Sequence, residues 1–230
     1  MHNLFCPEES NATRSIRKSF GESDEALFIV GGDGTYLRAL ATFGMGSVPP
    51  IYAFNSGTVG FLLPLSVCGI EATLDRIKNR QMRFIERRRL HIVSHGKMAS
   101  NEIVVYSKEH RLSIFRIQID GAPIELRGDS LTVATMSGST GHSFSIGGPM
   151  LLCDCVVINC GGANRCNFRP IVVSAESRIR IEARGCTGVV DNCFSVDDDL
   201  FEIEPGDVYR VAVDDDFNCV QTVPRAFSTK

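Results

Sequence analysis

The sequence predicts an α/β N-terminal domain with a parallel sheet, followed by an all-β sandwich. The first part rests on two apolar runs, 26–30 and 48–54, which flank a segment with helical spacing, as in a parallel strand pair. The second part rests on alternating apolar and polar residues, which dominate after about Ile85 and are typical of many short strands. We place the two domains at 1–65 and 66–230. The apolar stretch 219–223 is a candidate strand by which the C-terminal tail returns to the first domain.

Composition limits the possible partners. Of the 230 residues, 43% are hydrophobic and 22% are charged, which is ordinary for a globular protein. The formal net charge of -3 gives no electrostatic reason to expect nucleic acid or an anionic membrane as a partner. No apolar stretch is long enough to span a bilayer, and the N-terminal residues show no secretory signal. We therefore expect a cytoplasmic protein.

The cysteines do not form a recognisable framework. There are nine, an odd number, so free thiols in a reducing compartment are expected. Four of them cluster, but their spacing fits a zinc site poorly. We expect these four to be buried and unligated, with no metal site built by the protein alone: Cys153, Cys155, Cys160 and Cys166.

Several other segments have a local interpretation. Residues 1–24 are polar and unpatterned and are expected to be a loose arm or a poorly formed helix. Helices are expected at 35–43, ending before Gly44, and at 68–78. Asp120-Gly121 between two alternating runs indicates a hairpin. Three charged runs are interpreted as solvated, the first at a strand edge and the others in turns: Arg87–Arg89, Asp197–Asp199 and Asp214–Asp216.

The chain is organised around a glycine-rich turn that follows the first apolar run. Glycines allow another molecule to approach the backbone, and the N-terminus of the following helix favours phosphate. Asp33 lies inside this turn, where a carboxylate would repel phosphate unless it had another task. One such task is to accept a proton from a hydroxyl that attacks a phosphoryl group. The alternative is a tight turn in which Asp33 caps the helix. The turn consists of Gly31, Gly32, Asp33, Gly34 and Thr35.

A second loop with glycines follows the run 48–54 and contains Asn55 and Gly57. Both loops follow strands of a parallel pair, so they are expected at the same edge of the sheet, where open α/β sheets bind ligands. The alternative is an ordinary turn.

Two stretches of the β domain are not explained by the strand pattern. Asn101-Glu102 opens a strand, and an amide beside a carboxylate suits the hydroxyls of a sugar or the edge of an adenine. The alternative is a turn asparagine beside an exposed glutamate. Further along, a strand runs into a loop rich in hydroxyls and glycines, which is a plausible surface for phosphate and ribose. Its hydroxyls come from Thr135, Ser137, Ser139 and Thr140.

With these motifs in order, the sequence resembles the NAD kinases, which phosphorylate the 2′-hydroxyl of the adenosine ribose of NAD. The resemblance covers nearly all of the chain from Leu27 to about Val213. The sequence differs in carrying Gly141-His142 where the family usually has Ala-Tyr. The family's first strand and helix are not recognisable before the glycine turn, so the first domain is expected to be truncated. The matching segments are Gly31–Thr35, Asn55–Leu62, Asn101-Glu102, Gly128–Gly148 and Phe168–Val173.

The resemblance implies an α/β domain, a β-sandwich and a site between them. It implies NAD and ATP as substrates, a divalent cation (Mg²⁺) with the ATP, and a homodimer or homotetramer in which Asp129 reaches the ligand of a neighbouring subunit. Asp33 is implied as the catalytic base. Phosphates of ATP are implied to bind at Gly31, Gly32, Gly34, Thr35 and Arg38. NAD is implied to bind at Asn55, Gly57, Phe61, Asn101, Glu102, Arg127, Asp129, Ser137, Thr140, Gly141, His142, Ser143 and Ser145.

Two other functions are compatible with parts of the sequence. A lipid or sphingoid kinase shares the glycine turn, but the chain shows no basic or amphipathic segment that faces a membrane. A non-catalytic module that binds NAD(P) would have no need of Asp33. An NAD kinase is therefore the function that the sequence predicts.

Overall fold

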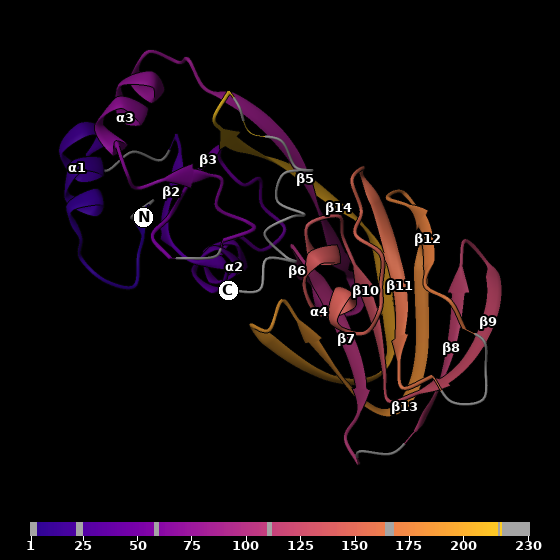
Figure 1. Ribbon diagram of the computed structural model, residues 1–230. Helices are drawn as coiled ribbons and strands as arrows, with labels where there is room; N and C mark the ends of the chain where they lie inside the picture. Colours follow the sequence, from indigo (N-terminus) through magenta and orange to yellow (C-terminus); the bar gives the residue numbers. More distant parts are fainter. Residues whose placement is uncertain are drawn as a thin grey trace. The chain divides into compact units, whose positions relative to one another are not determined.

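The computed structural model describes residues 4–21, 25–57, 60–109, 112–163, 168–215 and 217 (Figure 1). It divides into two compact units, which are treated separately below. Unit 1 contains Met1–Arg87 and Tyr209–Lys230, and unit 2 contains Arg88–Val208. The division differs from the boundary that we predicted after residue 65, because helix α3 (Ile70–Lys78) and the first half of strand β5 (Arg83–Ile92) pack with the first unit. The candidate tail strand at 219–223 lies outside the described residues. Among the described residues, no helix is both long and apolar enough to cross a membrane.

Unit 1 is built on parallel strands. Strands β1 (Leu4–Phe5), β2 (Leu27–Gly31), β3 (Ile51–Asn55) and β4 (Leu65–Ser66) pair in parallel, each with the next in sequence. The end of the long strand β14 (Phe194–Val213) joins β3 in parallel through Val211 and Ile51. The chain therefore does return to the first unit, but through β14.

Helices cover both faces of this sheet. Because side chains alternate along β2, Phe28 and Val30 pack with α1 (Asn11–Phe20) and α3 (Ile70–Lys78), which lie side by side in Figure 1. Leu27 and Ile29 pack on the other face with α2 (Asp33–Ala41). The predicted strand–helix–strand unit is confirmed, with its helix beginning at Asp33, two residues before the predicted start.

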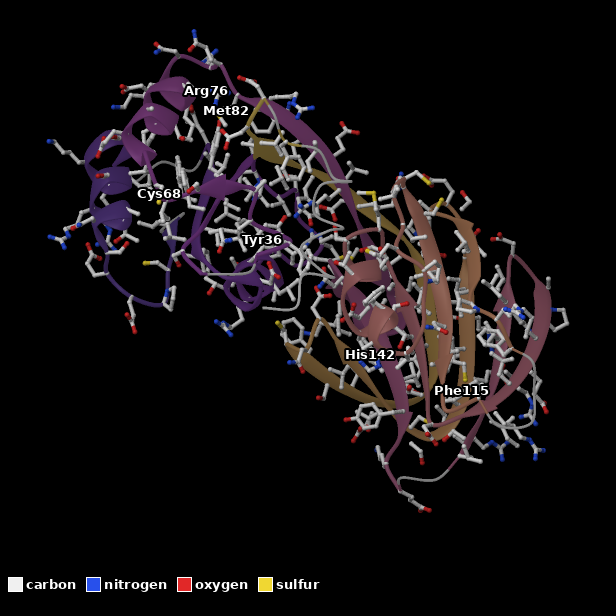
Figure 2. The ribbon with its side chains drawn as sticks, in the orientation of Figure 1. Tyr36, Cys68, Arg76, Met82, Phe115 and His142 are labelled. Carbon is white, nitrogen blue, oxygen red and sulfur yellow. The ribbon has the colours of Figure 1, made fainter. Side chains whose placement is uncertain are left out.

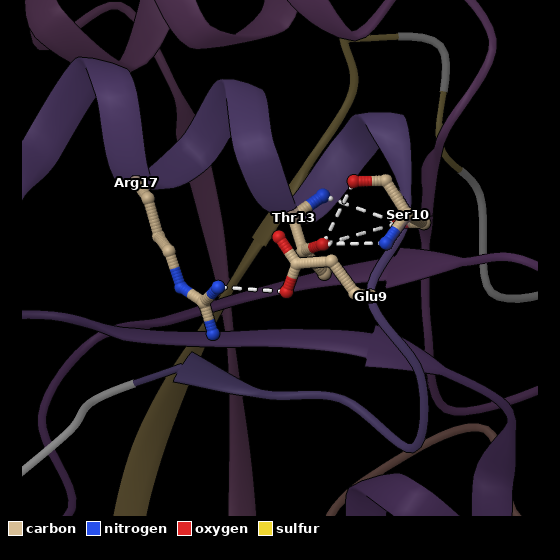
Figure 3. Close-up of polar contacts among 4 residues, drawn as sticks. All are labelled: Glu9, Ser10, Thr13 and Arg17. Carbon is tan, nitrogen blue, oxygen red and sulfur yellow. Dashed lines mark hydrogen bonds and ion pairs between the residues drawn. The ribbon is translucent and has the colours of Figure 1, made fainter.

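The N-terminal segment is more ordered than we predicted. β1 pairs with β2, and α1 is a regular helix whose Ala12 and Ile16 are buried in the core. Its start is fixed by a capping box (Figure 3), in which the Ser10 hydroxyl accepts the Thr13 N–H at 3.2 Å and the Thr13 hydroxyl accepts the Ser10 N–H at 2.8 Å. The predictions of a loose arm and of a missing first strand and helix were therefore wrong.

Unit 2 is antiparallel. β7 (Glu102–Ser107), β10 (Ser130–Ala134), β11 (Cys155–Gly161) and β12 (Ile171–Ser174) pair in the order β13-β7-β10-β11-β12. The long strand β13 (Ile179–Val190) pairs with β14 along its length, except at an irregularity between Glu182 and Cys186. Before this point β13 also pairs with β8 (Ser113–Ile119), and after it with β7. The irregularity therefore transfers β13 from one neighbour to the other.

The remaining strands of unit 2 complete this arrangement. β8 and β9 (Ala122–Gly128) form the predicted hairpin, whose two turn residues Asp120 and Gly121 have φ of 48° and 87°. β5 (Arg83–Ile92) pairs with β14 and with β6 (Lys97–Ala99), and the single turn Val93–His95 joins β5 to β6. Inward-facing residues of β7, β8, β10, β11, β13 and β14 form one apolar core.

Two of the charged runs differ from our interpretation. Arg87 and Arg89 lie on one face of β5 and are buried, with 6% and 1% of their surfaces exposed. The run Asp197–Asp199 lies within β14 and not in a turn; Asp197 accepts a hydrogen bond from Thr187 and pairs with Lys108. In the third run, Asp214 and Asp215 both pair with Arg76 of α3, and Asp216 lies outside the described residues. The first two runs are therefore not simply solvated.

Candidate active site

The glycine turn of unit 1 leads from β2 directly into α2. A side chain at Gly31 would meet the Thr35 hydroxyl oxygen at 2.6 Å, so only glycine fits beneath Thr35. Gly32 is the extended residue before the helix, and its carbonyl accepts the N–H groups of Thr35 and Tyr36. The N–H groups of Asp33 and Gly34, at the start of α2, have no acceptor within the helix. The turn therefore presents a helix N-terminus of the kind that favours phosphate.

Asp33 does not cap this helix. The helix start has no side-chain cap, and both Asp33 oxygens accept hydrogen bonds from the second glycine loop instead. The Leu62 N–H donates to Oδ1 at 2.9 Å, and the Phe61 N–H donates to Oδ2 at 3.2 Å. A carboxylate has about four acceptor positions, so two remain for a ligand. The helix-cap alternative for Asp33 is thereby excluded.

The two glycine loops lie at the same edge of the sheet, as predicted. Gly31 and Asn55 are paired residues at the ends of β2 and β3, and the Ser56 N–H donates to the Gly31 carbonyl at 3.0 Å. Asn55 Oδ1 accepts the Gly57 N–H at 2.9 Å, and a side chain at Gly60 would collide with the Asn55 amide at 2.6 Å. The loop is thus folded tightly around Asn55.

Arg38 also lies at this turn. It is an exposed residue one turn into α2, and its Nη1 is 3.6 Å from the position that a side chain on Gly34 would occupy. The guanidinium therefore lies over the first turn of the helix, where it adds positive charge to the helix N-terminus.

In unit 2, Asn101 and Glu102 are positioned by a residue that the sequence analysis missed. Asp191 follows β13, and its carboxylate accepts three consecutive backbone N–H groups, from Ser100 at 2.6 Å, Asn101 at 2.7 Å and Glu102 at 3.0 Å. Burial raises the pKa of Asp191 to about 6, although the three N–H groups and Arg89 favour its charged form. Asp191 fixes the backbone from which Asn101 and Glu102 project.

Glu102 is a partly buried carboxyl group with an unused acceptor. The His142 backbone N–H donates to it, while its Oε2 and Asn101 Oδ1 are buried without a hydrogen-bond partner within the described parts of the chain. Burial, followed by repulsion from Asp191, raises the pKa of Glu102 to about 7. Two buried acceptors without partners are costly in the free protein, and a ligand with hydroxyl or amino groups would satisfy them.

The loop after β10 packs directly against these two residues. The Thr135 N–H donates to the Asn101 carbonyl and its hydroxyl to the Ser100 carbonyl, at 2.8 and 2.7 Å. Gly138, in the single turn Gly138–Thr140, leaves no room for a side chain, because a Cβ there would lie 2.5 Å from the Asn101 carbonyl carbon. The loop is therefore fitted to the backbone of Asn101.

The hydroxyls of this loop are used mainly inside it. Thr140, Ser139 and Ser145 donate to the carbonyls of Ser137, Met136 and His142. The Ser143 hydroxyl is buried and has no partner among the residues that the structure describes. The helix that follows, α4 (His142–Ser145), has only four residues, and Figure 2 places the exposed His142 on it. Most of these hydroxyls therefore hold the shape of the loop.

Arg127 and Asp129 lie apart from this cluster. Both side chains are exposed, Arg127 on β9 and Asp129 between β9 and β10. Within the described residues, no hydrogen bond or ion pair joins either side chain to Asn101 or Glu102. The structure thus brings together Asp33, Phe61, Asn55 and the glycine turn in unit 1, and Asn101, Glu102, Gly141 and His142 in unit 2.

Comparison with known proteins matches both units to one family. The ATP-NAD kinase N-terminal domain matches residues 6–82, and the ATP-NAD kinase C-terminal domain matches residues 99–220. The chain belongs to the ATP-NAD kinase family. The predicted resemblance is confirmed.

The relatives are enzymes from diverse organisms. An NAD kinase from Methanopyrus kandleri is 33% identical over 172 residues, which cover 72% of this chain and 62% of the relative. An NAD kinase from Archaeoglobus fulgidus is 34% identical over 186 residues, which cover 77% of this chain and 72% of the relative. The chain therefore spans about two thirds of the length of these relatives.

Solved structures agree with this family. An NAD kinase from Archaeoglobus fulgidus in complex with ATP superposes with a TM-score of 0.81 at 26% identity, covering 97% of this chain and 95% of that one. A yeast NADH kinase complexed with NADH superposes with a TM-score of 0.82 at 24% identity, covering 91% and 68%, and shows the same fold.

Side chains that could ligate a metal are not clustered in the part of the chain that the structure describes. Across the described residues, no group of three His, Cys, Asp or Glu side chains is placed to hold a metal ion. Of the predicted cysteine cluster, Cys160 is buried, whereas Cys153 is exposed and lies 3.5 Å from the sulfur of half-buried Cys155. The prediction that all four thiols are buried was therefore wrong for these two, and Cys166 lies outside the described residues.

The raised pKa of Glu102 predicts a pH-dependent stability. Its folded pKa, about 7, lies above the ordinary value of 4.5, so its contribution is complete below about pH 4.5 and is lost as the pH rises through 7. The pKa of Asp191 is raised from 3.8 to about 6, so its contribution to stability is likewise lost as the pH rises through 6. In Glu102→Gln, the free energy of unfolding should therefore exceed that of the parent at pH 8 by roughly 2–3 kcal/mol.

Urea unfolding at several pH values checks this prediction. The two proteins should converge well below pH 4.5, where Glu102 is neutral in both the folded and the unfolded state, and this convergence is the internal control. If the free energies of unfolding of Glu102→Gln and of the parent differed by the same amount at every pH, Glu102 would not be a buried carboxyl group with a raised pKa.

Proposed function

We propose that this chain is an NAD kinase, which transfers the γ-phosphoryl group of ATP to the 2′-hydroxyl of the adenosine ribose of NAD to give NADP. The observation that supports it most directly is the Asp33 carboxylate, which is held by two N–H groups, does not cap its helix and keeps two acceptor positions free. Family membership supplies the substrates: relatives are named NAD kinases, and one solved relative binds ATP.

Asp33 acts as the general base in this proposal. Its free acceptor positions take the proton of the attacking 2′-hydroxyl, while the Phe61 and Leu62 N–H groups hold the carboxylate in place. The N–H groups at the start of α2 and the Arg38 guanidinium bind phosphate oxygens and offset their charge. Catalysis consists mainly of positioning and charge stabilisation, as is usual for phosphoryl transfer.

Asn101 and Glu102 bind the dinucleotide. Their buried and unpartnered oxygens, Asn101 Oδ1 and Glu102 Oε2, accept hydrogen bonds from ribose hydroxyls or the adenine amino group. Because the pKa of Glu102 is about 7, part of the population is protonated near neutral pH and can donate as well. His142, whose backbone N–H donates to Glu102 and whose side chain is exposed, borders the same position, and we assign Ser143 to the dinucleotide site as its neighbour in sequence.

The divalent cation enters with the nucleotide. Because the described residues supply no three-carboxylate cage, we propose that Mg²⁺ is bound as the MgATP complex, held by phosphate oxygens and water. We also propose a cytoplasmic homodimer or homotetramer in which the exposed Asp129 contacts a neighbouring subunit's ligand. Light scattering of an active preparation should therefore give a multiple of 25.2 kDa.

The proposal also assigns a ligand to each of the two units. We assign unit 1 as the α/β domain that binds the triphosphate and unit 2 as the β-sandwich that binds NAD. The shared apolar core of β7, β8, β10, β11, β13 and β14 supports a sandwich.

The test is direct turnover. Purified protein with NAD, ATP and Mg²⁺ should form NADP, followed with a dehydrogenase that accepts NADP alone. Parallel reactions replace NAD with NADH, or with a diacylglycerol or sphingoid base. NAD binding without turnover would instead support a non-catalytic dinucleotide-binding module, and turnover of the lipids alone would support a lipid kinase.

A further inference from the structure

Unit 1 contains a buried arginine, Arg87, which has no assigned role in the proposed function. Arg87 lies in β5 with 6% of its surface exposed, among the apolar residues that pack between the sheet and α2. Its Nη1 donates to the Leu62 carbonyl at 3.0 Å and to the Tyr36 hydroxyl at 3.2 Å. In the part of the chain that the structure describes, no ion pair joins Arg87 to a carboxylate. A buried cation in such a place is costly, and an apolar residue of similar size often serves stability better.

Leu62 connects Arg87 to Asp33. The Leu62 N–H donates to Asp33 Oδ1 at 2.9 Å, while the Leu62 carbonyl accepts from Arg87. Leu62 is itself 3% exposed, so neither of its peptide groups can turn to water. The loop residue is therefore held from both sides, by the carboxylate on one peptide group and by the arginine on the next.

Tyr36 connects Arg87 to the helix that carries Asp33. It lies three residues after Asp33 in α2, is fully buried and is labelled in Figure 2. The Arg87 guanidinium carbon lies 5.6 Å from the centre of the Tyr36 ring, and the Tyr36 hydroxyl is 3.3 Å from that of Tyr209. Arg87 thus joins α2 to the loop at Phe61-Leu62.

The charges support the same connection. Burial by itself lowers the pKa of Arg87, but the neighbouring Tyr36 and Tyr209 and the negative charge of Asp33 outweigh it and raise that pKa. The contribution of Asp33 is the smallest of these, and Asp33 is the residue to which Leu62 connects Arg87.

We infer that Arg87 is a positioning residue for the catalytic base: by holding the Leu62 carbonyl and the Tyr36 hydroxyl together, it aims the N–H groups that orient Asp33. This inference rests on the proposed function, in which Asp33 accepts the proton. It assigns Arg87 no contact with either substrate. Its loss should therefore affect kcat more than the KM of NAD or ATP.

The test is a double-mutant cycle between Arg87 and Asp33. Arg87→Met keeps most of the side-chain volume but removes the donors, and should lower kcat by about 10–30-fold while each KM changes by less than about threefold. In the Asp33→Asn background the same change should lower kcat by less than about twofold, because no base remains to be oriented. An equal loss in both backgrounds, or an unchanged kcat in Arg87→Met, would overturn the inference.

Two further variants keep the cycle interpretable. Arg89→Met removes another buried arginine of β5, which pairs with Asp207 at 2.7 Å, and any change in kcat should be the same in both backgrounds. Tyr36→Phe removes only the hydroxyl that Arg87 contacts, and should lower kcat by about threefold in the parent and not at all with Asp33→Asn. If Arg87→Met does not fold, the Tyr36 cycle decides, and a loss that persists with Asp33→Asn would contradict the inference.

An amide hydrogen-exchange measurement separates this inference from the proposed function. In Arg87→Met the Leu62 N–H should exchange at least tenfold faster than in the parent, whereas the amides of Ile29 and Val30 in β2 should not change. Absence of NADP formation by the parent would refute the kinase but not this effect. Unchanged Leu62 exchange would refute the role of Arg87 even in an active kinase.

Discussion

Asparagine in place of Asp33 should lower kcat for NADP formation by about 10²–10⁴-fold, the usual contribution of a general base. The amide cannot take the proton of the 2′-hydroxyl at neutral pH. NAD binding should survive or become tighter, because a negative charge close to phosphates has been removed. Steady-state kinetics with NADP formation, together with calorimetric titration of NAD, measures both effects.

The same substitution carries a structural cost that must be separated from its catalytic effect. Two N–H groups, from Phe61 and Leu62, donate to the two Asp33 oxygens. Asparagine has one acceptor oxygen, so its NH₂ group faces one of these donors and leaves it unsatisfied, at about 1–3 kcal/mol. The melting temperature should therefore fall by roughly 2–12 °C, since about 2–4 °C corresponds to each kcal/mol in a chain of this size.

A control substitution separates the effect of Asp33→Asn on kcat from the general effect of a substitution in unit 1. Gly46→Ala alters an exposed position of unit 1 with open space around it, and should leave kcat, NAD binding and the melting temperature unchanged. The role of Asp33 as base is contradicted if folded Asp33→Asn retains kcat within a few-fold of the parent at a temperature well below its melting point.

The glycine turn could be predicted because its parts are neighbours in the sequence. Strand 26–30, the glycine turn and α2 follow one another, and the parallel pairing of β2 with β3 places Asn55 beside Gly31. What the turn does with Asp33 depends on Phe61 and Leu62, which are 28 and 29 residues away. No local spacing distinguishes a helix cap from a carboxylate bound by a second loop.

The buried charges could not be predicted for a related reason. Arg87 and Arg89 sit in a run of three arginines, which in sequence is typical of a solvated edge. They can be buried because distant groups accept their hydrogen bonds, such as the Leu62 carbonyl for Arg87 and Asp207 for Arg89. Asp191 is likewise 89–91 residues from the three N–H groups that it accepts. These residues acquire their roles only from tertiary contacts.

The N-terminal helix was predicted only as a poorly formed alternative to a loose arm, although a local signal for a regular helix was present. Ser10 and Thr13 have the spacing of a capping box, and Ala12 and Ile16 lie four residues apart on one face. The remaining residues of α1 are polar, so the apolar stripe is narrow. It suffices because α3 and β2 complete the core beside it, with Ile16 only 2% exposed.

Alanine in place of Gly138 should weaken NAD binding by about 30–150-fold. Its Cβ would overlap the Asn101 carbonyl oxygen and lie 2.5 Å from the carbonyl carbon, and backbone atoms cannot rotate away as a flexible side chain can. The loop would have to move off the start of β7, which breaks the Thr135 N–H bond to Asn101 and shifts the His142 N–H from Glu102. Overpacking of this kind costs roughly 1–3 kcal/mol, and a loss of 2–3 kcal/mol corresponds to this change in affinity.

Calorimetric titration of NAD and of ATP separates this effect from general destabilisation. Because Gly138 lies in unit 2 beside the proposed NAD residues, NAD affinity should fall while ATP affinity changes by less than about threefold. Gly46→Ala again provides the matched substitution, with unchanged affinity for both ligands. Equal losses for NAD and ATP would indicate a global defect and would contradict the assignment of Asn101 and Glu102 to NAD. Unchanged NAD affinity in folded Gly138→Ala would contradict it as well, since the backbone of Asn101 cannot remain in place beside an alanine.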